Sequence, residues 1–531
     1  MRATLHYIDR LVTRSPLLPI FLLIIIVGGT AALYLHDLDK YSLLYYGDSV
    51  SHLVIARSII DSIGPGLHQI GTVWLPLPFF LLLPFSLINF LFKTGLSGTF
   101  VSLPCLAITS LFLFRMIKTF APTYYIGLAG ALLYAFNPNI LYIGITAMTE
   151  APFMLFFVAS AYYFQRWTEQ FTEHHDSLSD LLKCSIFICL ATLCRYEGWI
   201  LPIFFITLVA LFFLKKRHNI YVRKTTTKAL LTSTVSVSGI VFWLLFNAYL
   251  YGDPLKFANA DYYSAASQAL SRPYRELLFL QPFNVLSIYA KTALAMYGPL
   301  LLGSAVIGYV LYELFCARKN SKIRLTFLYL ALPPFLTLIL LIAGIGEMGT
   351  WFNSRFLVLL SPLVVLLVSI LIKLLPKAIR ENRLALGSLI CLLFAYPLLT
   401  PIIGEVITFS DAKNGFLYNP NPFAVQTGEV LGSKYKGNGS IMMLTGSPQG
   451  HRIMSSSGIS LRHFDEISGA SIQNTSFYEP WLSDKWLVIS KQHAADAKNT
   501  TVYWLNRQNV LDEHFKTAYE NQYYKILVAI D

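Results

Sequence analysis

Residues 17–35 read LLPIFLLIIIVGGTAALYL. This run carries no charged side chain, is long enough to cross a bilayer as one helix, and follows a basic tail that contains Arg2, Arg10 and Arg14. Because no clear A-x-A cleavage motif ends the run, we interpret it as a retained signal anchor and not as a signal peptide. The N-terminus is then expected to lie in the cytoplasm.

The composition extends this interpretation to the whole chain. Of the 531 residues, 55% are hydrophobic, 15% are aromatic and only 13% are charged, whereas soluble proteins carry about 25% charged residues. The mean hydropathy is +0.55. One buried helix cannot explain so large a deficit of charge, so a polytopic membrane protein is predicted. A disordered chain, a small disulfide-stapled module and a compact soluble enzyme are excluded.

Further apolar runs have about the length that a membrane crossing requires. With the signal anchor they predict an all-α polytopic domain of about eleven transmembrane helices over residues 1–404. The runs lie near residues 97–115, 122–142, 150–167, 183–199, 200–214, 229–250, 292–315, 325–343, 356–374 and 384–403.

The apolar stretch Trp74–Phe92 is left out of this count. If it crossed the membrane, every later basic cluster would change sides, against the positive-inside rule. Its prolines Pro76, Pro78 and Pro84 favour a segment that lies in the outer interface or dips in and returns. The first outer loop then runs over residues 36–96.

The net charge of +12 belongs to the membrane part. Residues 405–531 hold 11 Lys and Arg against 12 Asp and Glu, which leaves 30 against 17 in residues 1–404. With the topology above, 21 of those 30 basic residues fall on the cytoplasmic side. Nucleic-acid binding is therefore not expected, and the multi-pass protein would lie in the plasma or inner membrane if the source is prokaryotic.

Residues 405–531 are polar and are expected to form a small α/β domain on the extracytoplasmic side. Short β-rich runs occur at Ser440–Leu444, Trp486–Ser490, Thr500–Leu505 and Tyr523–Ile530. The side chains of His451, Arg452, Arg462 and His463 are expected on its solvated surface.

The sequence contains no HExxH motif, no nucleotide-binding glycine loop and no cluster of Cys and His ligands. All six cysteines lie in apolar segments or a basic loop, so neither a disulfide framework nor a cysteine metal site is indicated. No metal ligands are assigned from these motifs.

The first outer loop carries the strongest candidate for chemistry. After Tyr46 and Gly47, helical periodicity puts Asp48, Ser51 and His52 on one side of a predicted interfacial amphipathic helix, with apolar residues on the other. Asp48 and His52 are four residues apart and can meet. Asp48 is either a helix N-cap or a general base. The glycine-rich and polar string that follows, residues 61–78, is of a kind that builds binding sites.

The order of these features resembles the GT-C glycosyltransferases. The features are a signal anchor, an outer loop with an acid near its start, Ala56-Arg57 inside the loop helix, a proline-rich apolar helix and many further spans. The resemblance covers roughly residues 10–410. It points to the family 39 branch, which includes dolichyl-phosphate-mannose protein mannosyltransferases and bacterial lipid A aminoarabinose transferases.

The resemblance implies that Asp48 is the catalytic acid of the loop. The family often has a second acid beside it, where this chain has Ser49, which weakens any expectation of a metal bridged by adjacent carboxylates. A second outer loop contributes another acid, and Glu150 occupies that place, although an acid after Thr149 and before Pro152 is also ordinary helix N-terminal chemistry.

Other polar residues lie where a substrate would meet the membrane. Arg195 and Glu197 are ionisable residues within a span, so they either line a cavity or form a structural ion pair. A last outer cluster holds Glu347, Trp351, Asn353 and Arg355. The residues expected to bind substrate are His52, Arg57, His68, Gln69, Trp74, Arg195, Glu197 and Arg355, with donor phosphate assigned to Arg57 and Arg195.

The expected activity is transfer of a sugar from a polyprenyl-phosphate donor to an extracytoplasmic acceptor, with inversion and with Asp48 as base. The resemblance implies this donor, since nucleotide sugars are cytoplasmic. No cofactor is required by the sequence, although Asp48 and Glu150 together could hold a divalent metal. The acceptor could be a protein, a glycan or a lipid. A transporter or lipid flippase with intramembrane Arg and Glu is the alternative.

Overall fold

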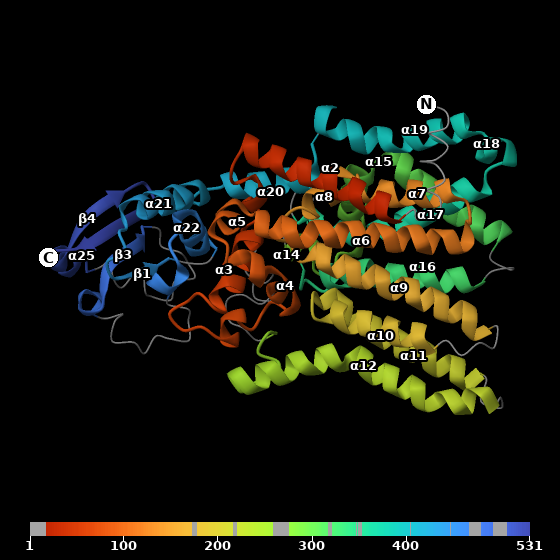
Figure 1. Ribbon diagram of the computed structural model, residues 1–531, viewed down its shortest axis with the longest axis horizontal. Helices are drawn as coiled ribbons and strands as arrows, with labels where there is room; N and C mark the ends of the chain where they lie inside the picture. Colours follow the sequence, from red (N-terminus) through yellow and green to blue (C-terminus); the bar gives the residue numbers. More distant parts are fainter. Residues whose placement is uncertain are drawn as a thin grey trace.

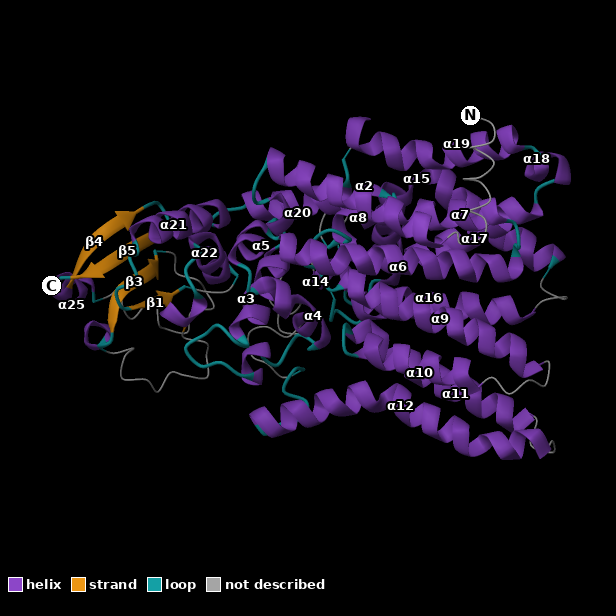
Figure 2. Ribbon diagram, viewed as in Figure 1, coloured by secondary structure: helices purple, strands orange, loops and turns teal. Residues whose placement is uncertain are grey.

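The computed structural model describes residues 17–172, 178–215, 220–258, 275–316, 321–346, 348, 353–403, 405–445, 448–466, 479–491 and 507–530. Long helices form one part of the molecule and a small mixed domain forms the other (Figure 1). The expected fold class, an all-α membrane domain with a small C-terminal α/β domain, is confirmed (Figure 2).

The membrane part is built mainly from long apolar helices. Among the described residues, six helices are long and apolar enough to cross a membrane: Leu17–Leu38, Leu96–Phe120, Thr227–Tyr251, Pro282–Phe315, Lys322–Ile342 and Ser354–Leu374. Its helices are α2 (Leu17–Leu38), α6 (Leu96–Phe120), α7 (Tyr124–Ala135), α8 (Pro138–Ile143), α9 (Glu150–Thr172), α10 (Leu178–Thr192), η3 (Tyr196–Trp199), α11 (Ile200–Lys215), α12 (Ile220–Tyr251), α14 (Arg275–Leu278), α15 (Pro282–Phe315), α16 (Ser321–Ile342), η4 (Ser354–Leu360), α17 (Ser361–Leu374), α18 (Lys377–Glu381) and α19 (Arg383–Ile403). The figure of about eleven crossings stays a prediction.

Two of the expected spans are interrupted. The run 122–142 divides into α7 and α8, because the Asn137 side chain accepts a hydrogen bond from the Asn139 amide at 3.0 Å and Pro138 starts a new helix. The run 183–199 ends as an α-helix at Thr192. Arg195 then adopts an extended backbone, and the short helix η3 follows.

The first outer loop folds into short helices. They are η1 (Ser42–Leu44), α3 (Gly47–Ser58), η2 (Leu67–Ile70), α4 (Leu77–Ser86) and α5 (Asn89–Thr94). The stretch 74–92 therefore contains two helices shorter than a crossing requires, and α4 packs against α3 and α6. Gly95 turns the chain from α5 into α6 at φ 78°, where a Cβ atom would lie 2.9 Å from Leu44 Cδ2.

The expectation of an amphipathic α3 is wrong, although the helix itself forms. Ser49, Ser51 and His52 are as buried as Val50 and Leu53. The reason is that helix α22 (Gln449–Ser457) of the C-terminal domain packs on α3, while the His52 ring lies against Ala147 and Trp74. On this side of α3, the Asp48 side chain remains 39% exposed.

The C-terminal domain contains a five-stranded mixed sheet in the order β2-β1-β3-β5-β4. Strand β1 pairs in parallel with β2 and β3, while β5 pairs antiparallel with β3 and β4. Three of the expected strands are confirmed, β2 and β4 were not expected, and Thr500–Leu505 lies outside the described residues. The elements are α20 (Ile407–Leu417), α21 (Asn421–Lys434), β1 (Ser440–Leu444), α22, η5 (Leu461–His463), β2 (Phe464–Glu466), η6 (Pro480–Leu482), β3 (Asp484–Ser490), α25 (Gln508–His514), β4 (Phe515–Glu520) and β5 (Tyr524–Ala529).

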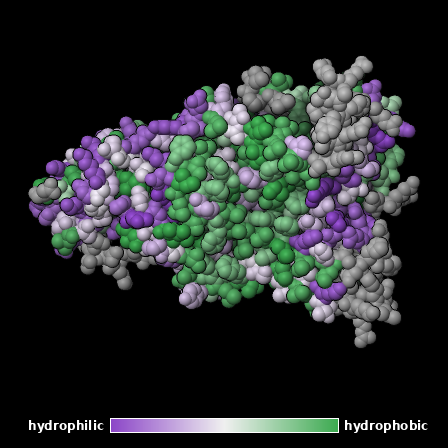
Figure 3. All heavy atoms as spheres, in the orientation of Figure 1, coloured by the Kyte–Doolittle hydropathy of each residue, from purple (hydrophilic) through white to green (hydrophobic). Residues whose placement is uncertain are grey.

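The surface divides into zones along the long axis. Figure 3 shows an apolar belt over the helices, with polar residues on the C-terminal domain at one end and further polar residues at the other. Helices α3, α4 and α5 lie between the long helices and the sheet (Figure 1). The protein is a multi-pass membrane protein, and the loop that contains α3, α4 and α5 lies where the apolar belt meets the polar domain (Figures 1 and 3).

Candidate active site

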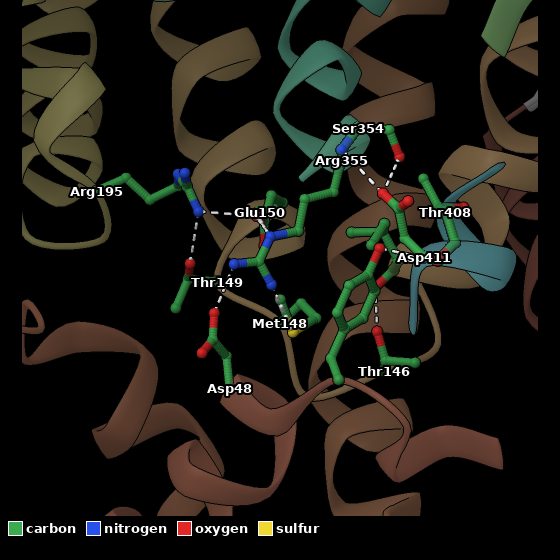
Figure 4. A network of polar contacts seen from close by, with 12 residues as sticks. Asp48, Thr146, Met148, Thr149, Glu150, Arg195, Ser354, Arg355, Thr408 and Asp411 are labelled. Carbon is green, nitrogen blue, oxygen red and sulfur yellow. Dashed lines mark hydrogen bonds and ion pairs between the residues drawn. The ribbon is translucent and has the colours of Figure 1, made fainter. Parts of the chain in front are cut away.

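Four segments far apart in the sequence bring charged side chains together at the end of the membrane part that faces the C-terminal domain. Asp48 comes from the first turn of α3, Glu150 from the first turn of α9, Arg195 from the break before η3, and Arg355 from η4. Figure 4 shows Arg355 reaching between the two carboxylates while Arg195 approaches Glu150 from another side. Residues predicted separately from the sequence therefore lie in one network.

Arg355 links the two expected catalytic acids. Its Nη2 lies 2.5 Å from Asp48 Oδ2, and its Nε lies 3.6 Å from Glu150 Oε1. The guanidinium also lies over the ring of Tyr46, 4.9 Å from its centroid. Only 10% of the Arg355 side chain is exposed, so these contacts replace most of the water that the cation would otherwise bind.

The local backbone explains how Arg355 is aimed. Asn353, just before η4, adopts a left-handed conformation with φ 52°, which Asn tolerates better than most residues. The next amide, that of Ser354, donates to Asp411 Oδ2 at 2.9 Å, and the Ser354 hydroxyl donates to the same oxygen. Asp411 of α20 was not expected at the site, because nothing in the sequence around it forms a motif.

Arg195 forms the second half of the network. Its Nη1 lies 2.9 Å from Glu150 Oε1 and donates to Thr149 Oγ1 at 3.0 Å, while its Nη2 lies 2.6 Å from Glu197 Oε1. The ring of Phe356 lies 5.4 Å from the centres of both guanidinium groups, Arg195 and Arg355. Arginines and carboxylates thus alternate, and the formal charge of the three carboxylates and two guanidinium groups is −1.

The carboxylates differ in access. The Asp48 side chain is 39% exposed, whereas that of Glu150 is completely buried. Burial raises the pKa of Asp48, but the charge and hydrogen bond of Arg355 outweigh it and hold this pKa below its usual value. Asp48 is therefore ionised at neutral pH and remains within reach of a molecule from outside the network.

His52 lies one turn after Asp48 and is buried. Its Nδ1 lies 2.8 Å from the Ala147 carbonyl oxygen, which can only accept, so Nδ1 carries the proton and Nε2 has a free lone pair. No described residue bonds this Nε2. Burial lowers the pKa of His52, which keeps the ring neutral. The rings of Trp74 and Phe79 meet it edge-on at 5.1 Å and 5.7 Å.

Other expected substrate residues lie elsewhere. Arg57, which was assigned to the donor phosphate, lies apart from the charged network: its guanidinium is buried between Asp61, at 2.6 Å, and the ring of Phe92, at 4.7 Å. Asp61, four residues further on, supplies the anion that this buried cation needs. His68 and Gln69 lie in η2, where Gln69 Nε2 donates to the Gly64 carbonyl. Glu347 and Trp351 lie outside the described residues.

The expectation of a solvated surface is wrong for two residues of the C-terminal domain. His451 and Arg452 are 7% and 3% exposed, because α22 faces α3. Arg452 Nη1 and Nη2 donate to the carbonyls of Leu44 and Tyr45 at 2.9 Å and 2.8 Å. Arg462 is largely exposed, yet its Nε lies 3.1 Å from Asp61. Their sequence contains no signal for this packing, since the partners lie about 400 residues earlier.

The network does not fit a divalent metal between Asp48 and Glu150 as it stands. The Arg355 guanidinium already bridges the two carboxylates. The described part of the chain contains no group of three or more His, Cys, Asp or Glu side chains arranged to hold a metal ion. A metal at this place would have to displace the arginine, so the chemistry below uses none.

Comparison with known proteins gives one family match. Residues 76–243 match the family model described as dolichyl-phosphate-mannose-protein mannosyltransferase. The matched range contains Glu150, Arg195 and Glu197 but neither Asp48 nor Arg355. The chain has no match among curated protein sequences.

Two solved structures are similar to the chain over most of its length, at low sequence identity. ArnT from Cupriavidus metallidurans, bound to undecaprenyl phosphate, is 10% identical with a TM-score of 0.49, over 95% of this chain and 98% of that one. The oligosaccharyltransferase AglB from Archaeoglobus fulgidus, in complex with an inhibitory peptide and a dolichol-phosphate, is 12% identical with a TM-score of 0.47, over 90% and 70%. Over residues 76–243, the chain therefore resembles the dolichyl-phosphate-mannose-protein mannosyltransferases.

Proposed function

We propose that this protein is a membrane glycosyltransferase that moves a sugar from a polyprenyl-phosphate donor to an acceptor on the extracytoplasmic side. The family match over residues 76–243 supports the class of reaction and of donor. The N-terminus would be cytoplasmic and the C-terminal domain extracytoplasmic, in keeping with the distribution of basic residues. The sugar and the acceptor, whether protein, glycan or lipid, are left open.

One observation carries the proposal. Asp48 is a half-exposed carboxylate whose partner, Arg355, belongs to an otherwise buried network of charges. Helix α3, which carries Asp48, lies between the apolar helices and the polar domain (Figures 1 and 3), which is the depth at which a membrane lipid carries its phosphate. A lipid-linked sugar and a water-soluble acceptor can reach such a carboxylate from opposite sides.

The geometry supports a single displacement. Asp48 takes the proton of the acceptor hydroxyl or amine while the freed electron pair forms a bond to the anomeric carbon. The bond between that carbon and the phosphate oxygen breaks on the opposite face, so the configuration inverts. The electron pair of the broken bond stays on the polyprenyl phosphate, and the positive charges of Arg355 and Arg195 stabilise it.

The ion pair between Asp48 and Arg355 implies that the donor binds before Asp48 becomes an effective base. Arg355 holds the pKa of Asp48 low, which makes the carboxylate a weak base. A donor phosphate that engages Arg355 competes with Asp48 for the guanidinium. When that positive charge is drawn away, the pKa of Asp48 rises and the base becomes stronger as the donor binds. Glu150 and Glu197 keep Arg195 in place.

His52 and Trp74 are assigned to the acceptor or the sugar. The free Nε2 of His52 can accept one hydroxyl proton, and Trp74 offers an aromatic face to a sugar ring. We leave His68 and Gln69 as loop residues that a bound acceptor could contact.

The test uses the purified full chain in lipid nanodiscs and the polyprenyl-phosphate sugar fraction extracted from the source membranes. Mass spectrometry of the lipids should show loss of the sugar and appearance of free polyprenyl phosphate, or transfer to an added acceptor fraction. Protein with Asp48→Asn is the matched control and should leave the donor intact. Movement of intact donor across the bilayer with no cleavage by the wild type would overturn the proposal in favour of a transporter or flippase.

A further inference from the structure

The C-terminal domain holds both ends of α3. At the end that carries Asp48, helix α22 comes so close that a Cβ atom on Gly47 would lie 3.3 Å from Pro448 Cγ. In the middle, Ser51 Oγ and His451 Nδ1 are hydrogen-bonded at 2.9 Å. Beyond the far end, Asp61 accepts hydrogen bonds from the C-terminal domain. The domain is therefore attached to the helix that presents the proposed base.

Arg452 makes the attachment nearest to Asp48. Its two terminal nitrogens donate to the carbonyls of Leu44 and Tyr45, which end η1 and lead into α3. A guanidinium binds two such acceptors at once because its donors form a rigid fork. Its face also lies 5.1 Å from the ring centroid of Phe416 in α20. The arginine thus fixes the peptide that precedes the first turn of α3.

Burial of the charged Arg452 side chain costs free energy that an exposed arginine would not lose. Arg452 is 3% exposed, and among the described residues no carboxylate forms an ion pair with it. Burial lowers the pKa of Arg452 to about 10, and the negative charge of Asp48 is among the influences that raise it again. A buried cation is expensive unless its partners compensate.

We infer that Arg452 is a positioning residue that, through the carbonyls of Leu44 and Tyr45, holds the start of α3 so that Asp48 faces Arg355. The inference rests on the proposed function, because it assumes that Asp48 is the base. It makes the C-terminal domain part of the catalytic unit and not only a surface for the acceptor. Misplacement of a reacting group by about 1 Å can cost about 10²-fold in rate.

The test compares Arg452→Met and Arg452→Lys in the full chain. Met keeps much of the side-chain volume but donates no hydrogen bond, whereas Lys keeps the charge and can reach one carbonyl. Lys516→Met, at an exposed lysine in β4 of the same domain, is the control. Each purified variant is checked for a monodisperse profile. Amide exchange is then measured by mass spectrometry for residues 46–53 and for β1.

We expect exchange in residues 46–53 of Arg452→Met to rise about tenfold or more, with β1 unchanged. With the extracted donor fraction, its maximal rate should fall about tenfold or more while the half-saturating donor concentration stays within about twofold. Arg452→Lys should recover part of both. Lys516→Met should match the wild type.

A folded Arg452→Met protein with unchanged exchange and unchanged rate would overturn the inference. So would a rise in exchange that is equal in residues 46–53 and in β1, because Arg452 would then stabilise the domain and not the base. If Arg452→Met does not fold, amide exchange and the transfer rate are measured for Arg452→Lys, and the same two results would overturn the inference. Failure of the proposed function is separate: the wild type would then cleave no donor, while the exchange data still show whether Arg452 fixes α3.

Discussion

The two clusters of arginine and carboxylate at the ends of α3 use the same residue types in opposite ways. Near its start, Asp48 is 39% exposed, and among the described residues Arg355 alone forms an ion pair with it. Just beyond its end, Asp61 is 6% exposed. Asp61 accepts hydrogen bonds from Arg57, the Ser460 hydroxyl, the Leu461 amide and Arg462. A carboxylate with four donors is a structural latch, whereas one with a single donor and an open side can react.

Removal of the proposed base should distinguish the two carboxylates most strongly. Asp48→Asn keeps the shape of the side chain but cannot accept a proton at neutral pH, so transfer should fall by about 10²-fold or more. The rate is measured with the extracted donor fraction. Asp61→Asn is the control and should retain the rate of the folded protein within a few-fold. Near-normal turnover by the Asp48→Asn protein would move the chemistry to another residue.

The hydrogen-bonded Asp61 should make the stability of the protein depend on pH in the acid range. Burial alone would raise the pKa of Asp61, but its hydrogen bonds to Ser460, Arg57 and Arg462 lower it to about 2. A lowered pKa means stability that is present above the pKa of the unfolded state and is lost as the pH falls through the folded value. The wild type should therefore be more stable than Asp61→Asn by about 2 kcal/mol above pH 4.

This advantage should shrink as the pH falls from about 4 towards 2. Thermal unfolding of the two purified proteins across this range measures it. A constant difference at all pH values would show that Asp61 contributes only its shape and not its charge.

Replacement of Arg355 and of Arg57 by Lys compares the two arginines as binders of the donor phosphate. Arg355→Lys keeps the charge but loses the fork that spans two anions, so the half-saturating donor concentration should rise about tenfold. Arg57→Lys should leave it unchanged, since Arg57 lies in the latch. Initial rates over a range of donor concentrations separate the two. If the half-saturating donor concentration rises more in Arg57→Lys than in Arg355→Lys, Arg57 and not Arg355 binds the donor phosphate.

A smaller effect is expected on the low-pH side of the pH–rate profile, where the transfer rate falls as the base becomes protonated. Because Arg355 lowers the pKa of Asp48, removing its charge raises that pKa. The base must be ionised, so in Arg355→Met the residual rate should begin to fall at a higher pH than in the wild type. If the rates of the wild type and Arg355→Met fall at the same pH, the ionisation of Asp48 does not control the rate.

Much of the fold could be predicted because apolar length and prolines are local signals. The runs that became α2, α6 and α15, and the short helices of the first outer loop, follow from residues that are adjacent in sequence. The breaks at Asn137 and Thr192 were missed, since a hydrophobic run continues across both. Hydropathy records burial in lipid or protein but not a change of backbone direction.

The site was predicted in part, for the same reason. Asp48, Glu150, Arg195 and Arg355 stand out because charges near apolar spans are rare, and the structure places them together. Asp411 and Arg452 could not be found this way, because they belong to polar segments where charge is ordinary. Arg57 was misassigned, since its partner Asp61 was counted only as part of a loop.

The contacts between α3 and α22 join residues about 400 positions apart, and this separation has a consequence for how the protein is made. At about 5–20 residues per second, a ribosome needs roughly 20–80 s to add that many residues. During this time the first loop has already been inserted beside the membrane, while Arg452 and the rest of α22 do not yet exist. Newly made chains should therefore pass through a stage in which the membrane helices are in place but Asp48 is not held, so that catalytic competence is acquired late in biogenesis.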